Sequence, residues 1–181
     1  MVGYAATMRI DRPPPGEELN TGEETVPRAS ASLILLRDAA EGPEVLLVRR
    51  NPEQRFMGGA WVFPGGATAP EDGDERATAV RELEEEAGIE LGDGHELVRF
   101  SRWITPAAVK TRFDTHFFVA EAPEEVEPTV DGSECVDWRW LAPQSALDQH
   151  RDDELMLVFP TIKHLEQLGR FRTVSEGLEH A

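Results

Sequence analysis

The hydrophobic residues of the chain gather in short runs that are separated by polar, glycine-rich or proline-rich turns. Residues 32–36 and 44–48 are apolar-rich runs of strand length, and a Glu-Gly-Pro turn at residues 41–43 lies between them. Runs bounded in this way predict two strands, with a third and shorter strand at residues 61–63. The later runs predict three more strands, at residues 96–104, 112–121 and 134–141.

After the third predicted strand the hydrophobic period changes to that of a helix. Asp72 with Glu75 fits a capping box, and Asp74 is a second candidate N-cap. The apolar residues of the segment share one side at roughly 100° per residue, and they are Ala79, Val80, Leu83 and Ala87. Gly88 is placed to end the helix in a left-handed conformation.

Two further helices are predicted towards the C-terminus. Residues 144–150 suit a short helix, and residues 155–168 suit a longer one. The longer helix has an apolar stripe formed by Leu157, Ile162, Leu165 and Leu168. Strands, a helix, more strands and a terminal helix together make an α+β pattern.

The first 28 residues differ in composition from the rest of the chain. They carry three successive prolines at residues 13–15, further glycine and proline, and many acidic residues. Such a composition favours extended, mobile chain, so we expect a flexible arm over residues 1–28. Residues 29–181 are then one folded domain with a sizeable core. Whether residues 1–6 pack on this domain or on a second chain is undecided, which leaves both a monomer and a homodimer open.

The chain is strongly acidic, with 35 Asp and Glu against 18 Lys and Arg, a net charge of −17 and a pI near 4.6. This field argues against nucleic acid or an anionic membrane as a partner, and it makes a polyphosphate substrate depend on local arginines and metal. Its one cysteine, Cys135, excludes an internal disulfide and a cysteine-based metal site. Because no apolar run reaches transmembrane length and the N-terminus lacks a leader pattern, we expect a cytoplasmic protein.

Three glutamates of the predicted helix, Glu82, Glu85 and Glu86, are neighbours because residues three and four apart share a helix face. A solvated acidic face is the alternative, but such a face would carry interspersed lysine, and the whole chain has two lysines. The cation on this turn is Arg81, which can pair with Glu85 four residues later. Carboxylates beside the bare backbone of a Gly-Gly turn suit Mg²⁺ or Mn²⁺ bound together with substrate phosphates.

The Gly-Gly turn at residues 65–66 and the run at residues 81–89 resemble the Nudix box, G-x5-E-x7-R-E-U-x-E-E-x-G-U with U aliphatic. Every position from residue 81 to residue 89 matches. The front half departs from the pattern, because fourteen residues rather than thirteen separate the turn from residue 81. We interpret this as a one-residue insertion, with Asp72 or Glu71 in place of the central glutamate.

The resemblance implies a Nudix-type fold, a mixed β-sheet sandwiched between helices, and a divalent metal, Mg²⁺ or Mn²⁺. The metal ligands that it implies are Gly65, through its main-chain carbonyl, Glu82, Glu85 and Glu86. In the alternative, Glu85 is oriented by Arg81 and does not bind metal. The family uses different glutamates as general base, and Glu85 and Glu134 are the two candidates here.

Residues 46–66 are similar to the signature of the coenzyme A-cleaving branch of this family, L-L-T-x-R-[SA]-x3-R-x3-G-x3-F-P-G-G. The spacing is reproduced throughout, with departures at Val48 and Asn51. The resemblance implies Arg50 and Arg55 as phosphate contacts, since guanidinium forks suit phosphate oxygens. The alternative for each is a solvated arginine at a strand end.

Two further residues are candidates for substrate binding. Arg112 is an available cation near the presumed cleft. Trp61 lies in a segment that resembles the acyl-CoA diphosphatase group, where an aromatic ring can stack on a base or flank an acyl chain. The alternative for Trp61 is simple core packing, which is the commoner role of such a residue.

Three hypotheses of function are therefore open, each with a small-molecule nucleotide as partner. The first is a metal-dependent hydrolase that cleaves the phosphoanhydride of a nucleoside diphosphate linked to another moiety, with coenzyme A or acyl-CoA as the best candidate. The second is an ADP-ribose or nucleoside-sugar pyrophosphatase. The third is a nucleotide-sensing domain without catalysis, against which the complete set of box carboxylates argues.

Overall fold

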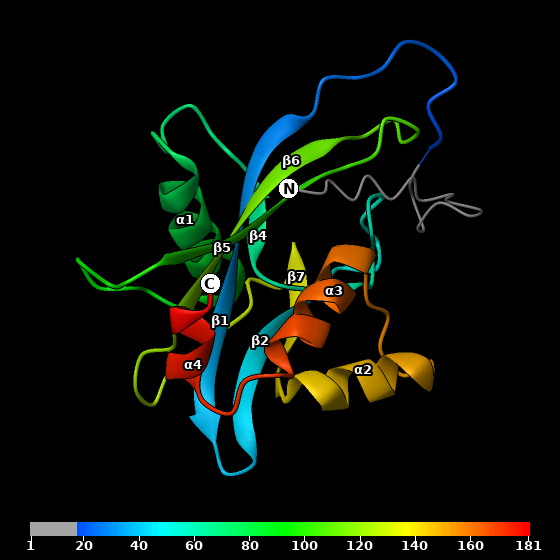
Figure 1. Cartoon of the computed structure of the whole chain (residues 1–181). Coiled ribbons are helices and arrows are strands. Elements are labelled where there is room, and N and C mark those ends of the chain that lie inside the picture. Colours follow the sequence, from blue (N-terminus) through cyan, green and yellow to red (C-terminus); the bar gives the residue numbers. More distant parts are fainter. Residues whose placement is uncertain (1–17) are drawn as a thin grey trace, which may run out of the picture.

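The computed structural model describes residues 18–181, which form a seven-stranded mixed sheet with helices on both faces (Figure 1). The strands are β1 Arg28–Ala39, β2 Gly42–Arg50, β3 Trp61–Val62, β4 Gly65–Ala67, β5 Val98–Ile104, β6 Phe113–Glu121 and β7 Cys135–Leu141. The helices are α1 Glu75–Ala87, α2 Pro143–Arg151, α3 Phe159–Leu168 and α4 Val174–Glu179.

Strand β1 is the centre of the sheet. It pairs antiparallel with β2 through the tight turn that follows it, and parallel with β6 on its other side. The order across the sheet is β3-β2-β1-β6-β5, with β7 added to β2 and β4 added to the first residues of β1. One parallel pairing among antiparallel ones makes the sheet mixed, so the predicted mixed sheet between helices is confirmed.

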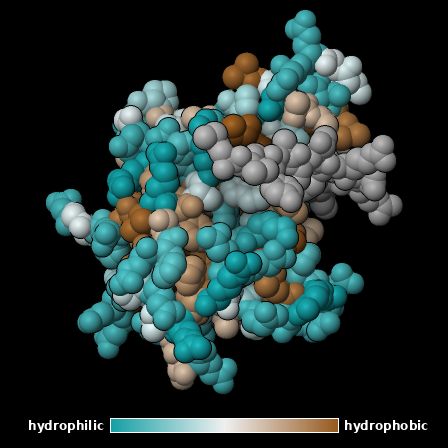
Figure 2. Space-filling model, in the orientation of Figure 1, coloured by the Kyte–Doolittle hydropathy of each residue, from teal (hydrophilic) through white to brown (hydrophobic). Residues whose placement is uncertain are grey.

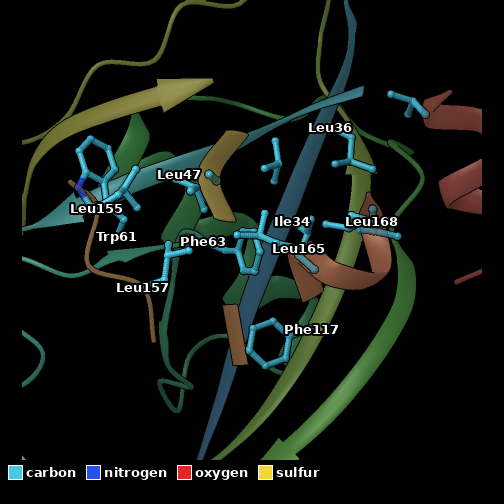
Figure 3. Packing of buried hydrophobic residues seen from close by; sticks show 14 residues of the cluster. Ile34, Leu36, Leu47, Trp61, Phe63, Phe117, Leu155, Leu157, Leu165 and Leu168 are labelled. Atoms are coloured by element: carbon cyan, nitrogen blue, oxygen red, sulfur yellow. The ribbon is translucent and has the colours of Figure 1, made fainter. Parts of the chain in front are cut away.

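Both faces of β1 are buried, which explains its unbroken apolar run. Leu33 and Leu35 pack into one cluster with the apolar side of α1. Ile34 and Leu36 point to the opposite face, into a second cluster with α2, α3 and α4 (Figure 3). A strand buried on both faces reads as continuous hydrophobic sequence and not as an alternating pattern.

Helix α1 begins and ends where its sequence predicts, and its N-cap is the second of the two candidate residues. Asp74 is the N-cap and accepts a hydrogen bond of 2.8 Å from the Ala77 amide. The capping box predicted from Asp72 is wrong, because the Asp72 carboxylate turns inward to other partners. Gly88 ends the helix at φ 64°, and a Cβ atom there would lie 2.9 Å from the Thr129 carbonyl oxygen.

Three elements differ from the sequence-based expectation. Helix α3 begins at Phe159 and not at residue 155, because the Trp61 amide bonds the Met156 carbonyl and Pro160 lies in the first turn, where proline is tolerated. Strand β4 was not predicted, since Gly-Gly-Ala carries no strand signal of its own. Helix α4 was also not predicted, because it has six residues and includes a glycine.

The predicted arm continues into a segment that contacts the domain. Residues 1–17 lie outside the described residues, and residues 18–27 run beside the loop between β5 and β6 (Figure 1). Leu19 forms an isolated antiparallel bridge with Val109, and the Asn20 amide donates to the Ala108 carbonyl at 2.8 Å. These main-chain contacts are not indicated by the composition of the arm. The domain boundary itself stays a prediction.

The visible surface is largely hydrophilic, with apolar residues in small groups (Figure 2). Among the helices of residues 18–181, none combines the length and apolarity needed to cross a membrane. The apolar surface of the described chain is instead buried in the two clusters on either side of the sheet.

We expect Gly88→Ala to lower the free energy of unfolding by about 2 kcal/mol, because it combines left-handed strain with a clash against Thr129. Gly73→Ala, at φ 79° in open space, isolates the strain and should cost about 1 kcal/mol. Gly92→Ala has neither problem and should be neutral or slightly stabilising. Urea denaturation would measure the series, and equal stability of all three variants would contradict the account of this helix end.

Candidate active site

A cleft of about 550 Å³ opens between the N-terminal half of β1, β4, α1 and the loop that precedes β3. The acidic residues of α1 form one wall, and the first residues of α3 contribute to another. Of the residues predicted to act at the site, the structure brings seven to this cleft, and they are Arg50, Gly65, Arg81, Glu82, Glu85, Glu86 and Glu134.

A side chain at either glycine of the Gly-Gly turn would meet a close neighbour, the Glu82 carboxylate of α1 at Gly66 and the backbone of β1 at Gly65. A Cβ atom on Gly66 would lie 2.5 Å from the carboxyl carbon of Glu82, and one on Gly65 would lie 2.6 Å from the Ala31 carbonyl oxygen. The Gly65 amide donates a hydrogen bond of 2.9 Å to the Glu86 carboxylate. The turn is thereby held against both β1 and α1.

Arg81 organises the acidic wall through a fan of contacts. Its Nη1 atom lies 2.9 Å from the Glu82 carboxylate and 2.7 Å from the Glu85 carboxylate. Its Nε and Nη2 atoms donate to the two oxygens of Asp72 at 2.7 and 3.0 Å, and Nη2 also donates to the Ala67 carbonyl. The Asp72 hydrogen bonds, and then the two glutamates, raise the pKa of Arg81 further. The guanidinium is therefore fixed in one pose.

Of Asp72 and Glu71, the two candidates for the central position of the box pattern, the structure brings Asp72 to Arg81. Its carboxylate is 3% exposed and accepts from Arg81, from the Thr78 hydroxyl and from the Ala69 amide. The Arg81 and Ala69 hydrogen bonds hold the pKa of Asp72 well below its usual value. Glu71 is exposed. The extra loop residue thus leaves the buried carboxylate in place on a shorter side chain.

Glu82 and Glu86 are buried acids whose negative charge is only partly offset by nearby cations and hydrogen-bond donors. Burial raises the pKa of Glu82 despite the opposing charge of Arg81. Burial likewise raises the pKa of Glu86 to about 7, against the opposing effects of the Gly65 amide and of Arg50, whose Nη1 lies 3.8 Å from the carboxylate. Two such carboxylates side by side favour a bound cation.

The donor set fits a hard divalent cation, although the carboxylates do not converge. Within residues 18–181 there is no group of three or more His, Cys, Asp or Glu side chains arranged to hold a metal ion. Arg81 draws Glu82 and Glu85 towards itself, and the Gly65 amide holds Glu86. Oxygen donors with raised pKa values are nevertheless the ligands that Mg²⁺ and Mn²⁺ prefer. The individual metal ligands stay a prediction.

Glu134 reaches the cleft from the turn before β7. Asp131 shapes this turn, because its carboxylate accepts from the amides of Ser133, Glu134 and Cys135. The Glu134 carboxylate is close enough to add to the pKa rise of Glu82. Sequence reasoning missed Asp131, for which the Asp-Gly-Ser turn was the available signal.

Arg50 and Arg55, the two predicted phosphate contacts, lie in different parts of the structure. Arg50 lines the cleft, and its Nη2 atom donates to Gln54. The Arg55 side chain is 83% exposed, does not line the cleft and pairs with Glu18.

Arg112 and Trp61 are likewise outside the cleft lining. The Arg112 guanidinium is buried and donates to the Thr105 and Thr25 carbonyls and to Glu24, so it ties the arm to the β5–β6 loop. Trp61 is 4% exposed and lies in the core beside Leu157 (Figure 3). The alternative of core packing therefore describes its position.

An apolar wall faces the acidic one. The aromatic and aliphatic residues that line it are Phe56, Met57, Val62, Phe113, Phe117 and Val158. The rings of Phe56 and Phe113 lie 5.7 Å apart, in a tilted pair. Arg28 was placed at the end of the arm and also lines the cleft. A mixed lining of this kind suits a substrate with both phosphate and apolar parts.

Fold and cleft together are a mixed sheet between helices with a cleft that is lined by carboxylates. Residues 26–159 match the NUDIX domain family. The chain therefore belongs to the Nudix family of hydrolases. A crystal structure of a NUDIX hydrolase from Alicyclobacillus acidocaldarius is similar, with 27% identity and a TM-score of 0.81 over 87% of this chain and 97% of that one. The Nudix-type fold implied by the sequence resemblance is thus confirmed.

Curated relatives resemble the chain at lower coverage of their own length. Putative nudix hydrolase 7 of Caenorhabditis elegans is 26% identical, over 80% of this chain and 61% of that protein. Acyl-coenzyme A diphosphatase NUDT19 of Homo sapiens is 25% identical, over 76% of this chain and 63% of that protein. The chain thus spans about three fifths of the length of each.

Glu86→Gln should stabilise the metal-free protein at pH 8, because it removes a buried charge. The wild-type carboxyl has a folded pKa of about 7, above the usual 4.5, so its ionisation costs stability as pH rises through that window. The variant's advantage should be near zero at pH 4 and on the order of 1–3 kcal/mol at pH 8. Urea denaturation with chelator at both pH values measures it.

Glu85→Gln is the matched control, because the Glu85 side chain is 59% exposed. It should show no comparable gain at pH 8. Equal pH dependence in wild type and Glu86→Gln would contradict the picture of a buried, under-compensated carboxylate.

Proposed function

We propose that this protein is a metal-dependent diphosphatase that hydrolyses the phosphoanhydride of a nucleoside diphosphate linked to another moiety. The observation that carries the proposal is the pair of buried glutamates, Glu82 and Glu86, beneath the Gly65–Gly66 turn and open to a cleft that also holds Arg50. Acids whose charge is only partly offset, next to an arginine that lines the same cleft, suit a cation and a phosphate better than either alone.

The chain's own groups have distinct parts in such a reaction. Mg²⁺ or Mn²⁺, held by Glu82, Glu86 and the Gly65 carbonyl, with Glu85 as a further ligand, would neutralise phosphoryl charge and lower the pKa of a nucleophilic water. Arg81 fixes the pose of the glutamates through its contacts with Asp72. Arg50 is placed to donate to a phosphoryl oxygen.

Glu134 is the stronger of the two candidates for the general base. It lines the cleft, and its own main chain is held by Asp131 and Asn51. Glu85 is instead paired with Arg81 at 2.7 Å, so its carboxylate is turned to the guanidinium.

Coenzyme A or an acyl-CoA is the substrate that we favour. The signature spacing at residues 46–66 supports it, as does the likeness to a relative named acyl-coenzyme A diphosphatase. The apolar wall of the cleft gives a surface for the pantetheine or acyl part. An ADP-ribose or nucleoside-sugar substrate is the alternative; the NUDIX domain of Shewanella oneidensis NrtR, crystallised with ADP ribose, shares the fold at 17% identity and a TM-score of 0.62.

Glu86→Gln should lose at least about two orders of magnitude in kcat with saturating Mg²⁺, on the scale of one major electrostatic stabiliser. Because the substitution should not destabilise the fold, the loss reports on chemistry. Phosphate-release kinetics on the preferred substrate measure it. Turnover within a few-fold of wild type would remove Glu86 from the metal site.

A substrate panel tests the CoA proposal directly. Coenzyme A should be cleaved within its central diphosphate to 3′,5′-ADP and 4′-phosphopantetheine, which chromatography with mass detection identifies. We expect kcat/KM for CoA or an acyl-CoA to exceed that for ADP-ribose, NADH and dinucleoside polyphosphates by about 10-fold or more, the scale of one lost charged contact. Faster turnover of ADP-ribose would overturn the CoA assignment and leave the diphosphatase class intact.

A further inference from the structure

One carboxylate of the arm holds two cations from two different loops. Glu18 pairs through one oxygen with the Arg55 guanidinium and through the other with the Lys110 ammonium, at 2.9 Å. Lys110 is one of two lysines in a chain of net charge −17. The hydrogen bonds and charges of Lys110 and then Arg55 lower the pKa of Glu18, so the carboxylate is ionised between them.

Both cations lie on loops that also build the cleft. Arg55 immediately precedes Phe56, which lines the apolar wall. Lys110 lies in the β5–β6 loop between Thr105 and Phe113, and both of these residues line the same cleft. Since the Phe56 and Phe113 rings contact each other, the two loops meet at this end.

We propose that Arg55 and Lys110 form a binding site for a terminal phosphate monoester of the substrate, which Glu18 occupies in the free protein. The inference rests on the proposed diphosphatase function and narrows its substrate class. In this proposal the substrate carries, besides its diphosphate, a further phosphate group that reaches this end of the cleft. The 3′-phosphate of coenzyme A is a phosphate group of this kind.

A phosphate is the stronger ligand for this pair of cations. A phosphate monoester carries nearly two negative charges and three acceptor oxygens, so it can bind an arginine fork and an ammonium together. The contacts of Glu18 are solvent-exposed, with side chains 49% to 83% exposed, and exposed ion pairs are weak. Glu18 is thus readily displaced, while it shields the cations from other anions.

The site formed by Arg55 and Lys110 supplies local positive charge, whereas the net negative charge of the chain repels a phosphorylated ligand. Of the other cations next to the cleft, Arg81 is held by Asp72 and Arg112 by Glu24, whereas Arg28 and Arg50 line the cleft itself. Once Glu18 leaves, two positive charges remain on adjoining loops for an incoming anion. Such complementary charge raises the affinity for a phosphorylated ligand and discriminates against one that lacks the phosphate.

The two lysines of the chain allow a direct test. Reductive ¹³C-methylation keeps the charge of each lysine and yields one side-chain methyl signal for Lys110 and one for Lys163, with Lys163→Arg for assignment. The metal-free protein is titrated with CoA and with 3′-dephospho-CoA. The Lys110 signal should shift on CoA binding, and the apparent Kd for CoA should be about 3- to 10-fold below that for dephospho-CoA.

Glu18→Gln and Glu23→Gln are matched variants with the same charge change at neighbouring positions. Glu18→Gln removes the competitor and should lower the apparent Kd for CoA about 3- to 10-fold, without change for dephospho-CoA. The Glu23 side chain pairs with neither cation, so Glu23→Gln should match the wild type. Equal affinity for the two ligands, a Lys110 signal that CoA does not shift, or a Glu18→Gln variant that behaves as Glu23→Gln would each overturn the proposal.

The binding titration does not depend on catalysis. A Lys110 response to CoA in a protein that does not hydrolyse CoA would support the phosphate site and refute CoA as the hydrolysed substrate. CoA hydrolysis without a shift of the Lys110 signal would support CoA as the hydrolysed substrate and refute the phosphate site. The two proposals therefore fail separately.

Discussion

The close approach of the Gly65–Gly66 turn to α1 is the constraint on which the rest of the site depends. Without side chains at these two positions, β4 can pair with the first residues of β1 while the Glu82 and Glu86 carboxylates pack against its backbone. That packing buries two acids, and burial raises the pKa values of both. The fold therefore keeps two acids buried although Arg50 and Arg81 only partly offset their charge.

The strongly acidic composition makes the position of every arginine informative. Arg81 is fixed by Asp72 and serves the acidic wall, whereas Arg112 is buried and serves the arm. Arg50 is the cation that stays close to the buried Glu86 and open to the cleft. Among these three arginines, Arg50 is therefore the one left to meet a phosphate of the proposed substrate.

Much of the fold was predictable from the sequence, and much less of the site. The strands of the sheet were evident because both of its faces are buried, so residues such as Leu33 and Ile34 stand in continuous apolar runs. The carboxylates of α1 were evident because helical spacing alone brings Glu82 and Glu86 together. The role of Asp72 was not, since an extra loop residue hides it and only tertiary contact with Arg81 distinguishes it from Glu71. Trp61 was a candidate ligand contact because a sequence cannot distinguish an apolar residue that lines a cleft from one that is buried beneath it.

The arm shows most clearly where composition stops being a guide. Its proline, glycine and acidic residues predict a free segment, because hydrophobic burial is what usually offsets the entropy of ordering a chain. Residues 18–25 are instead held by main-chain hydrogen bonds to the β5–β6 loop and by two carboxylates, Glu18 and Glu24, on cations of that loop. Each such contact is weak, and together they join the arm to the rim of the cleft. An acidic segment anchored by ion pairs can be released by a competing anion, whereas a segment anchored by apolar burial cannot, so the polarity of this arm is what would let a phosphate displace Glu18 from the proposed site.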